Sequence, residues 1–402
     1  MTEPAPGRSG GHRVGIVADD LTGAIDAASA FMARHYRARI LRLGVRPSEP
    51  VRVPVAAFDT DSRACDSVEA WGRLQEATSH PAIRKADVLF KKIDSTLRGQ
   101  PARETADVLA LLKRDLVVVT PAHPAQGRLF VDGALWVHGK PVSQTRYARD
   151  DSAPASAKPL AAQFQECLPA ARVVTGVQPP VPLEGEVTVW VADASTPEEL
   201  TGVAAFALAH AARGVIAGAA GLAGALAELL ARVDHPTEDA HARPSKPPRL
   251  FVVGSRADES RRQIERLCAS GGGHLWQIDP TREPGGELVS LPAENVPVVL
   301  APHPAIEASP AQVARALARA AHELVDRWSL HAVFACGGDT AGALLDSLGV
   351  KSFGSQGEVT RGVCRSLVRY GSRTLEFFTK PGGFGDENVL LELLAQTQRA
   401  AA

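Results

Sequence analysis

Residues 13–24 read RVGIVADDLTGA, an apolar run that ends abruptly in two carboxylates, a threonine and a glycine. Such a run is typical of a buried strand, and a helical segment follows it at 24–33. The same order of strand, polar turn and helix recurs at 88–112 and at 332–345. Strands that alternate with helices predict βαβ units, so we expect an α/β fold with mainly parallel sheets flanked by helices.

The 402 residues are too many for one ordinary core, and a polar, proline-rich stretch divides them. The expected parts are a disordered tail at 1–12, a first domain at 13–232, a linker at 233–248 and a second domain at 249–402. Further strands are predicted at 37–43, 51–58, 116–119, 187–191, 214–217, 250–253, 296–300 and 375–379. Further helices are predicted at 68–77, 197–213, 222–230, 259–269 and 311–328.

Residues 128–145 break this alternation inside the first domain. They contain two turn dipeptides, Asp132-Gly133 and His138-Gly139, between β-type runs. Dipeptides of this kind connect the strands of β-hairpins, so we expect an antiparallel hairpin insertion there.

Composition argues against several classes of protein. The chain carries 44 basic and 45 acidic residues, so bulk charge favours neither a nucleic acid nor a membrane as a partner. The five cysteines form no CxxC pair, which suits a reducing cytoplasm better than a disulfide framework or a cysteine zinc site. The N-terminus lacks a secretory apolar segment, and no apolar run reaches the roughly 18 residues of a membrane helix.

Ligands of open α/β sheets bind beyond the carboxyl ends of the strands, so the residues directly after each strand matter most. Carboxylates there accept hydrogen bonds from hydroxyls, and a guanidinium suits a carboxylate or phosphate, as a polyhydroxy-acid pocket requires. The competing interpretation is that the aspartates cap helices and that the lysines are solvated. The polar residues at these strand ends are Asp19, Asp20, Asp59, Asp61, Arg63, Lys91, Lys92, Asp94, Ser95 and Arg98.

Glycine-rich turns follow three predicted strands of the second domain. They are Gly254-Ser255, the segment CGGDTAG at 336–342, and the segment KPGGFG at 380–385. Glycines let backbone N–H groups approach a phosphate, and a helix N-terminus favours the anion, so together these turns predict a nucleotide site.

Two other glycine patterns do not qualify as motifs. Residues 133–140 resemble a Walker loop, but Pro141 stands where Ser or Thr is required. Gly218, Gly221 and Gly224 have the spacing GxxGxxG, which favours close helix packing over dinucleotide binding.

Seven blocks, in order along nearly the whole chain, resemble the four-carbon acid sugar kinase family, which includes D-threonate kinases and 3-oxo-tetronate kinases. The resemblance implies that the first domain binds a sugar acid, that the second binds ATP, and that ATP phosphorylates a terminal hydroxyl. The blocks are ADDLTGAIDAA (18–28), DTDSRA (59–64), FKKIDSTLRGQPARE (90–104), TPAHPAQGR (120–128), VVGSRADESRRQI (252–264), CGGDTAGALL (336–345) and TKPGGFGDENVL (379–390).

By matching position, the resemblance implies nucleotide contacts at Ser255, Gly337, Gly338, Asp339, Thr340, Gly382, Gly383, Phe384 and Gly385. It places Asp20, Asp59, Arg63, Lys92, Asp94 and Arg98 at the substrate, and Asp19 adjoins them. Two positions depart from the family pattern. Pro381 replaces the serine of KSGGFG, and Ala219-Ala220 stand where GSAG has a hydroxyl.

For phosphoryl transfer, Asp20 is the first candidate to orient or deprotonate the hydroxyl, and Asp94 is the second. A purely positioning role for Asp20 is the equal alternative. Arg98 would hold the substrate carboxylate and Lys92 would offset phosphate charge, while Asp339 is the candidate ligand for Mg²⁺.

The identity of the acid stays open, and a homodimer is the commonest default assembly. Two other activities fit the α/β pattern: an NAD-dependent oxidoreductase, which the missing GxGxxG disfavours, and a non-catalytic sugar-acid binding protein, which the glycine turns disfavour.

Overall fold

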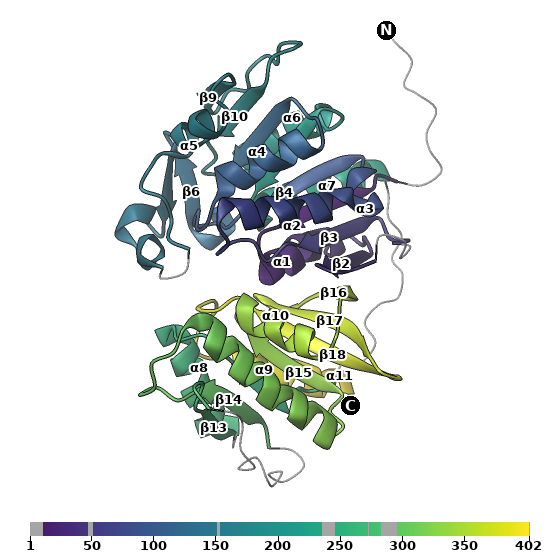
Figure 1. The fold of residues 1–402 in the computed structure, drawn as a ribbon, viewed down its shortest axis with the longest axis vertical. Coiled ribbons are helices and arrows are strands. Elements are labelled where there is room, and N and C mark those ends of the chain that lie inside the picture. Colours follow the sequence, from purple (N-terminus) through teal and green to yellow (C-terminus); the bar gives the residue numbers. More distant parts are fainter. Residues whose placement is uncertain are drawn as a thin grey trace. The chain divides into compact units, whose positions relative to one another are not determined.

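The structure, a computed structural model, describes residues 11–46, 51–150, 153–234, 246–271, 273–282 and 296–401. These residues form two compact units (Figure 1). The first unit takes in the described residues up to Asp19, Ala30–Ala38 and Arg46–Asp239. The second takes in Asp20–Ser29, Arg39–Val45 and the described residues from Ala240 onward. A single cut in the sequence therefore does not separate the units, and the domain boundaries proposed from the sequence stay a prediction.

The first unit is built on a parallel sheet whose strands lie in the order β3-β1-β4-β11-β5-β10-β9. Most of these strands are buried along their whole length, as expected where helices cover both faces of a parallel sheet. The strands are β1 (Val14–Ala18), β3 (Val55–Asp59), β4 (Val88–Lys92), β5 (Leu116–Thr120), β9 (Arg172–Gly176), β10 (Thr188–Ala192) and β11 (Gly214–Gly218). The helices are α2 (Ser67–Ser79), α3 (Pro81–Arg84), α4 (Pro101–Leu111), α5 (Leu160–Cys167), α6 (Pro197–Ala209) and α7 (Ala220–Asp234).

The predicted antiparallel insertion is confirmed. It is a small sheet of β6 (Arg128–Val131), β7 (Ala134–Val137) and β8 (Lys140–Pro141). Asp132 and Gly133 both have positive φ angles, 51° and 72°, which is the backbone of a two-residue hairpin turn. Short 3₁₀ turns, η2 (Val142–Gln144) and η3 (Arg146–Arg149), continue from the sheet.

The sheet of the second unit has the order β13-β14-β12-β15-β18-β17-β16-β2. The five strands from β13 to β18 in this order run parallel, and the last three junctions are antiparallel. The strands are β2 (Ala38–Arg42), β12 (Leu250–Val253), β13 (His274–Ile278), β14 (Val298–Pro302), β15 (Ala332–Cys336), β16 (Ser352–Thr360), β17 (Val363–Tyr370) and β18 (Arg373–Lys380). The helices are α1 (Leu21–Met32), which belongs to this unit up to Ser29, α8 (Asp258–Gly271), α9 (Pro310–Arg327), α10 (Gly338–Ser347) and α11 (Val389–Ala401).

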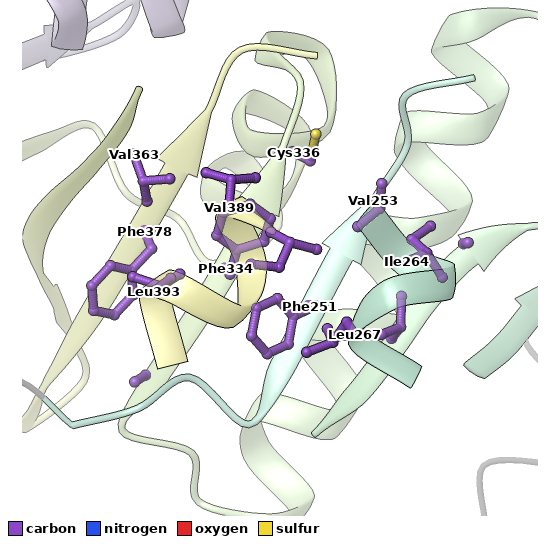
Figure 2. Packing of buried hydrophobic residues seen from close by; sticks show 14 residues of the cluster. Phe251, Val253, Ile264, Leu267, Phe334, Cys336, Val363, Phe378, Val389 and Leu393 are labelled. Atoms are coloured by element: carbon purple, nitrogen blue, oxygen red, sulfur yellow. The ribbon is translucent and has the colours of Figure 1, made fainter. Parts of the chain in front are cut away.

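Aromatic and branched side chains hold α8 and α11 to one face of this sheet (Figure 2). Phe251 and Phe334 lie in contact on neighbouring strands, with ring centroids 5.3 Å apart. Leu267 of α8 and Leu393 of α11 complete the same fully buried cluster. The core thus fixes β12, β15 and β18, whose carboxyl ends carry the glycine turns.

The sequence did not reveal the antiparallel strands β16 and β17. Residues 352–360 are rich in glycine and polar side chains, and their side chains alternate between buried and partly exposed positions. A strand of this kind gives no continuous apolar run, so pairing with its neighbours defines it. The elements β9, β13, α3, α5 and α11 also escaped the sequence pattern.

Two expected segments fall largely outside the described residues, namely 1–10 of the tail and 235–245 of the linker. At their edges, His12 donates its backbone N–H to Asp234 at 3.0 Å, and α7 extends through Asp234. Among the described helices, none is long and apolar enough to cross a membrane.

Candidate functional site

Three neighbouring strands of the first unit bring their carboxyl ends together. The register aligns Ala18 of β1 with Asp59 of β3 on one side and with Lys92 of β4 on the other. Asp19 follows directly after β1, and Asp94 follows β4 by two residues, so the predicted substrate residues of the first unit share one edge of the sheet. This follows from parallel pairing, which sequence spacing alone does not supply.

The charged side chains at this edge form a row in which arginines and aspartates alternate. Arg63 donates Nε and Nη2 to the two oxygens of Asp19 at 2.8 and 2.9 Å. Arg98 makes the same two-pronged contact with Asp94, at 3.0 and 2.9 Å. Arg63 Nη1 lies 3.8 Å from Asp94 Oδ1, which links the two pairs. Arg98 also donates Nη1 to Asp150 at 3.1 Å.

The neighbouring arginines strongly favour the ionised form of Asp94. Burial works to raise its pKa, but Arg98 and Arg63 outweigh burial and hold the pKa well below its ordinary value of 3.8. The same partnership raises the pKa of Arg98. A carboxylate with so low a pKa is a poor proton acceptor, so Asp94 is better suited to position Arg98 than to act as a base.

The two adjacent lysines of β4 face different surroundings. Lys91 forms a fully buried ion pair with Glu104, with Nζ 2.8 Å from Oε2. Burial raises the pKa of Glu104, against the opposing effect of Lys91. Lys92 is also buried, but among the described residues its one side-chain hydrogen bond goes to the carbonyl of Ile93, at 2.9 Å. The interpretation that these lysines are solvated is therefore wrong.

Asp20 and Asp59 each organise the turn in which they lie. Asp20 Oδ1 accepts the backbone N–H of Gly23 at 2.9 Å, and Oδ2 accepts the hydroxyl of Thr22 at 2.6 Å. The predicted helix cap at Asp20 is thus present. Asp59 Oδ1 accepts the backbone N–H of Asp61 at 3.0 Å. Asp94, by contrast, caps no helix, because α4 begins at Pro101 after the cap residue Gln100.

In the second unit, β12, β15 and β18 are neighbours and end in register. Val253 pairs with Cys336, and Cys336 pairs with Lys380, so the three glycine turns begin side by side. The backbone N–H of Gly337 donates to the carbonyl of Lys380 at 2.9 Å, which joins two of the turns.

Close packing explains why small residues occupy these turns. A Cβ at Gly254 would collide with Thr340 Oγ1, and a Cβ at Gly382 would lie 3.2 Å from Ser255 Oγ. A Cβ at Gly338 would lie 3.1 Å from Asp20 Oδ2, and both of these residues belong to the second unit. Gly337, with φ 98°, precedes α10 and has no side chain to cap the first N–H groups. The turns therefore form a cradle suited to phosphate.

Two further residues complete the cradle. The half-buried ring of Phe384 packs directly on Gly362 in the turn between β16 and β17. Asp339 lies exposed in the first turn of α10. The described residues hold no group of three or more potential metal-ligating side chains, so Asp339 would be a single protein ligand. That suits Mg²⁺, which commonly uses one or two carboxylates together with phosphate oxygens.

Two family models match the chain, a sugar-binding N-terminal domain over residues 14–226 and a nucleotide-binding C-terminal domain over 292–390. The chain is 30% identical to the D-threonate kinase of Bordetella bronchiseptica over 412 residues, which cover 95% of this chain and 96% of that protein. It belongs to the four-carbon acid sugar kinase family.

A second D-threonate kinase agrees with that assignment, and a solved structure shares the fold. The D-threonate kinase of Salmonella typhimurium is 27% identical over 421 residues, which cover 94% of this chain and 97% of that one. A solved structure described as a putative tRNA synthase from the same species matches with a TM-score of 0.74 at 18% identity, covering 96% of this chain and 99% of that chain. The structural likeness concerns the fold alone.

Membership of the sugar kinase family decides among the activities that the sequence left open. The chain is a phosphotransferase that acts on a hydroxyl of a sugar acid, rather than an oxidoreductase or a binding protein. The substitution of the family's loop serine by Pro381 removes a hydroxyl and an N–H from the cradle. The residues Ala219 and Ala220 lie buried in the first unit, where Ala220 begins α7.

Sequence reasoning missed several residues that contact the candidate site residues. Asp150 reaches Arg98 from the segment after the antiparallel insertion, and the ring of Tyr147 lies 5.7 Å from the Arg98 guanidinium. No motif marks these two residues. Lys380 and Gln263 were missed as well, although both lie inside segments that resemble family blocks.

Proposed function

We propose that this chain transfers the γ-phosphoryl group of ATP to the terminal hydroxyl of a four-carbon sugar acid. D-threonate is the first substrate to test, because two relatives that match over almost their full length carry that name. A 3-oxo-tetronate is the second, from the motif resemblance. The observation that carries the proposal is the set of three glycine turns that end adjacent strands of the second unit.

The nucleotide role rests on backbone chemistry. The turns after β12, β15 and β18 offer N–H groups without side chains in the way, and α10 begins at one of them. A helix N-terminus carries partial positive charge, which favours a phosphate. We propose that Ser255, the Gly337–Thr340 turn and the Gly382–Gly385 loop contact the nucleotide. Asp339 would help to hold Mg²⁺, whose chemistry is to neutralise phosphate charge.

The sugar-acid role rests on the row of alternating arginines and aspartates in the first unit. Arg98 uses three of its five N–H groups on Asp94 and Asp150, which leaves two for a substrate carboxylate. Lys92 adds a buried cation. Carboxylates of Asp19 and Asp59 lie at the same edge and suit substrate hydroxyls. A short polyhydroxy acid offers both kinds of group.

Asp20 is the proposed residue at the reacting hydroxyl. Its carboxylate lies beside Gly338 at the start of α10, within the second unit, where the proposed phosphate cradle begins. A carboxylate there can orient the hydroxyl and accept its proton as the new O–P bond forms. Asp94 is the weaker candidate, because two arginines hold its pKa low.

We also propose that the enzyme works in a reducing cytoplasm. All five cysteines lie within the described residues as free thiols, and Cys336 and Cys364 are buried. A homodimer stays a prediction, which light scattering on the purified chain would decide.

The test of the proposal is a coupled assay of ADP release against a panel of sugar acids. The panel would hold D-threonate, D-erythronate, L-threonate and 3-oxo-tetronates of both hands. We expect D-threonate to give the highest kcat/KM and a product phosphorylated at the terminal carbon, which phosphorus NMR identifies. Turnover of none of these acids, by a folded protein that binds ATP, would contradict the proposed substrate class.

A further inference from the structure

Lys380 is a fully buried lysine at the root of the glycine loop. It is the last residue of β18, and its side chain has no exposed surface. Its ammonium group donates to three carbonyls of the loop that follows, those of Pro381 at 3.1 Å, Gly382 at 3.1 Å and Phe384 at 2.8 Å. An ammonium has three N–H groups, so all of them are used within the loop.

Gln263 holds the same loop from the other side. It extends from α8 and is only 1% exposed. Its amide nitrogen has two N–H groups, which three successive carbonyls share. These are Phe384 at 3.0 Å, Gly385 at 3.2 Å and Asp386 at 2.9 Å. The carbonyl of Phe384 therefore accepts from both side chains, and two separate elements fix the path of the loop.

In this arrangement most carbonyls of the loop accept hydrogen bonds, whereas several of its N–H groups donate none to the described part of the chain. The carbonyls of Pro381, Gly382, Phe384, Gly385 and Asp386 accept from Lys380 or Gln263. The N–H groups of Gly382, Gly383 and Gly385 donate to no acceptor within the residues that the structure describes. The N–H of Phe384, which lies between them, donates within the loop to the carbonyl of Pro381 at 3.4 Å. Adjacent N–H groups such as those of Gly382 and Gly383 form the kind of backbone arrangement that binds anions.

Lys380 also leaves a positive charge without a matching carboxylate. Across the described parts of the chain, the recorded partners of its Nζ are the three loop carbonyls, and no aspartate or glutamate is among them. Burying an ammonium that only carbonyl dipoles compensate is costly, and a bound anion near the loop would offset that cost. Lys91, which is also almost fully buried, differs because it pairs with Glu104.

We propose that Lys380 and Gln263 are positioning residues of the nucleotide site, and that Lys380 also adds charge that favours the phosphates of ATP. The proposal rests on the proposed function, since it deepens the role of the Gly382–Gly385 loop. Neither side chain needs to touch the nucleotide. Lys380 acts through the loop and through its electrostatic field, and Gln263 acts through the loop alone.

The experiment measures the binding of adenosine, ADP and ATP by calorimetry, without sugar acid, for the wild type, Lys380→Met and Lys351→Met. Lys351 is an exposed lysine of the same unit, paired with Asp346, and serves as the matched control. For Lys380→Met we expect the Kd for ATP to rise at least about tenfold, with a smaller rise for ADP and the smallest for adenosine. The KM for the sugar acid should stay within about twofold of the wild type, because Lys380 lies outside the proposed acid site.

Equal losses for adenosine and ATP, or unchanged ATP affinity in a folded Lys380→Met protein, would overturn the proposal. If circular dichroism shows that Lys380→Met does not fold, Gln263→Met decides instead. That variant keeps the volume and loses the amide donors, and we expect its KM for ATP to rise about three- to tenfold with kcat nearly unchanged. An unchanged KM for ATP would then overturn the proposal. Failure of the proposed function looks different, because the wild type itself would not consume ATP with any sugar acid.

Discussion

The two units carry different chemical groups at the carboxyl ends of their strands. In the first unit, long charged side chains gather at β1, β3 and β4, and the pairs Arg63–Asp19 and Arg98–Asp94 hold one another in place. In the second unit, β12, β15 and β18 end in turns with almost no side chains, and what they present is backbone. The same α/β architecture thus offers a side-chain site in one unit and a backbone site in the other.

The difference corresponds to two kinds of ligand. A short sugar acid differs from its stereoisomers in where each hydroxyl points, and side chains can be placed to read those positions. A triphosphate presents many equivalent oxygens, and closely spaced N–H groups suit it well. In the second unit the charged and amide side chains, Lys380 and Gln263, lie behind the backbone that they shape. The comparison therefore predicts that side-chain changes damage acid recognition and that added Cβ atoms damage nucleotide binding.

We expect the largest effect at Asp20. It is an exception to this division, because it is a carboxylate side chain beside a glycine turn. Asp20→Asn keeps a side-chain oxygen that can cap α1, so the helix should remain intact. If Asp20 is the base, kcat should fall by about 10²–10⁴-fold with little change in either KM. Steady-state kinetics check this, with thermal unfolding as the control for folding. Near-normal turnover would leave Asp20 with a positioning role only.

Gly254→Ala tests the backbone site directly. The new Cβ would collide with Thr340 Oγ1, so the turn or the start of α10 must move. We expect the KM for ATP to rise by roughly one to two orders of magnitude, with the KM for the acid unchanged. Gly72→Ala in α2 is the matched control, since its Cβ would meet no atom within 4 Å. That variant should keep full activity and gain about 0.5–1 kcal/mol of unfolding free energy.

Arg98→Lys tests the side-chain site in the same assay. A lysine keeps the charge but loses the two-pronged contact with Asp94 and the planar donors offered to a carboxylate. We expect the KM for the acid to rise about tenfold and the Kd for ATP to stay unchanged. If ATP binding weakens as much as acid binding, the two units do not divide recognition as the comparison states.

Pro381→Ser should strengthen ATP binding rather than weaken it. The change restores the hydroxyl and the backbone N–H of the family's usual loop. We expect the KM for ATP to fall about threefold, close to the value of one net hydrogen bond. The assay is the KM for ATP at saturating acid. A rise in that KM would mean that the fixed φ of Pro381 helps to set the loop.

The smallest expected effect is a pH dependence of stability from Asp94. Its pKa in the folded protein lies well below 3.8, the ordinary value of the unfolded chain. At pH values above 3.8, Asp94 therefore makes its full contribution to the free energy of unfolding. This contribution is lost as the pH falls below about 3.8 toward the folded pKa, because the unfolded chain then binds the proton more readily. Melting temperatures at pH 7 and pH 3 should differ by a few degrees less in Asp94→Asn than in the wild type. An identical difference in both proteins would contradict this coupling.

Parts of the fold and site could be predicted because local chemistry dictates them. The apolar runs of β1, β4 and β15 are continuous and end in polar or glycine turns, so strand, turn and helix are all marked. The hairpin at Asp132-Gly133 is marked by residues that tolerate positive φ angles. Strand β16 was missed because its side chains alternate in burial, and β17 was missed because polar side chains interrupt its apolar residues; pairing across the sheet defines both strands.

The sequence by itself determined which residues end the strands, and therefore which side chains and glycines a ligand can meet. Only the tertiary structure decided their partnerships. It paired Arg98 with Asp94 and Asp150, paired Lys91 with Glu104 while leaving Lys92 with a single carbonyl, and turned Lys380 and Gln263 onto the same loop. The reason is physical: a strand end is a local property of the chain, whereas a hydrogen bond between residues far apart in sequence depends on strand order and register.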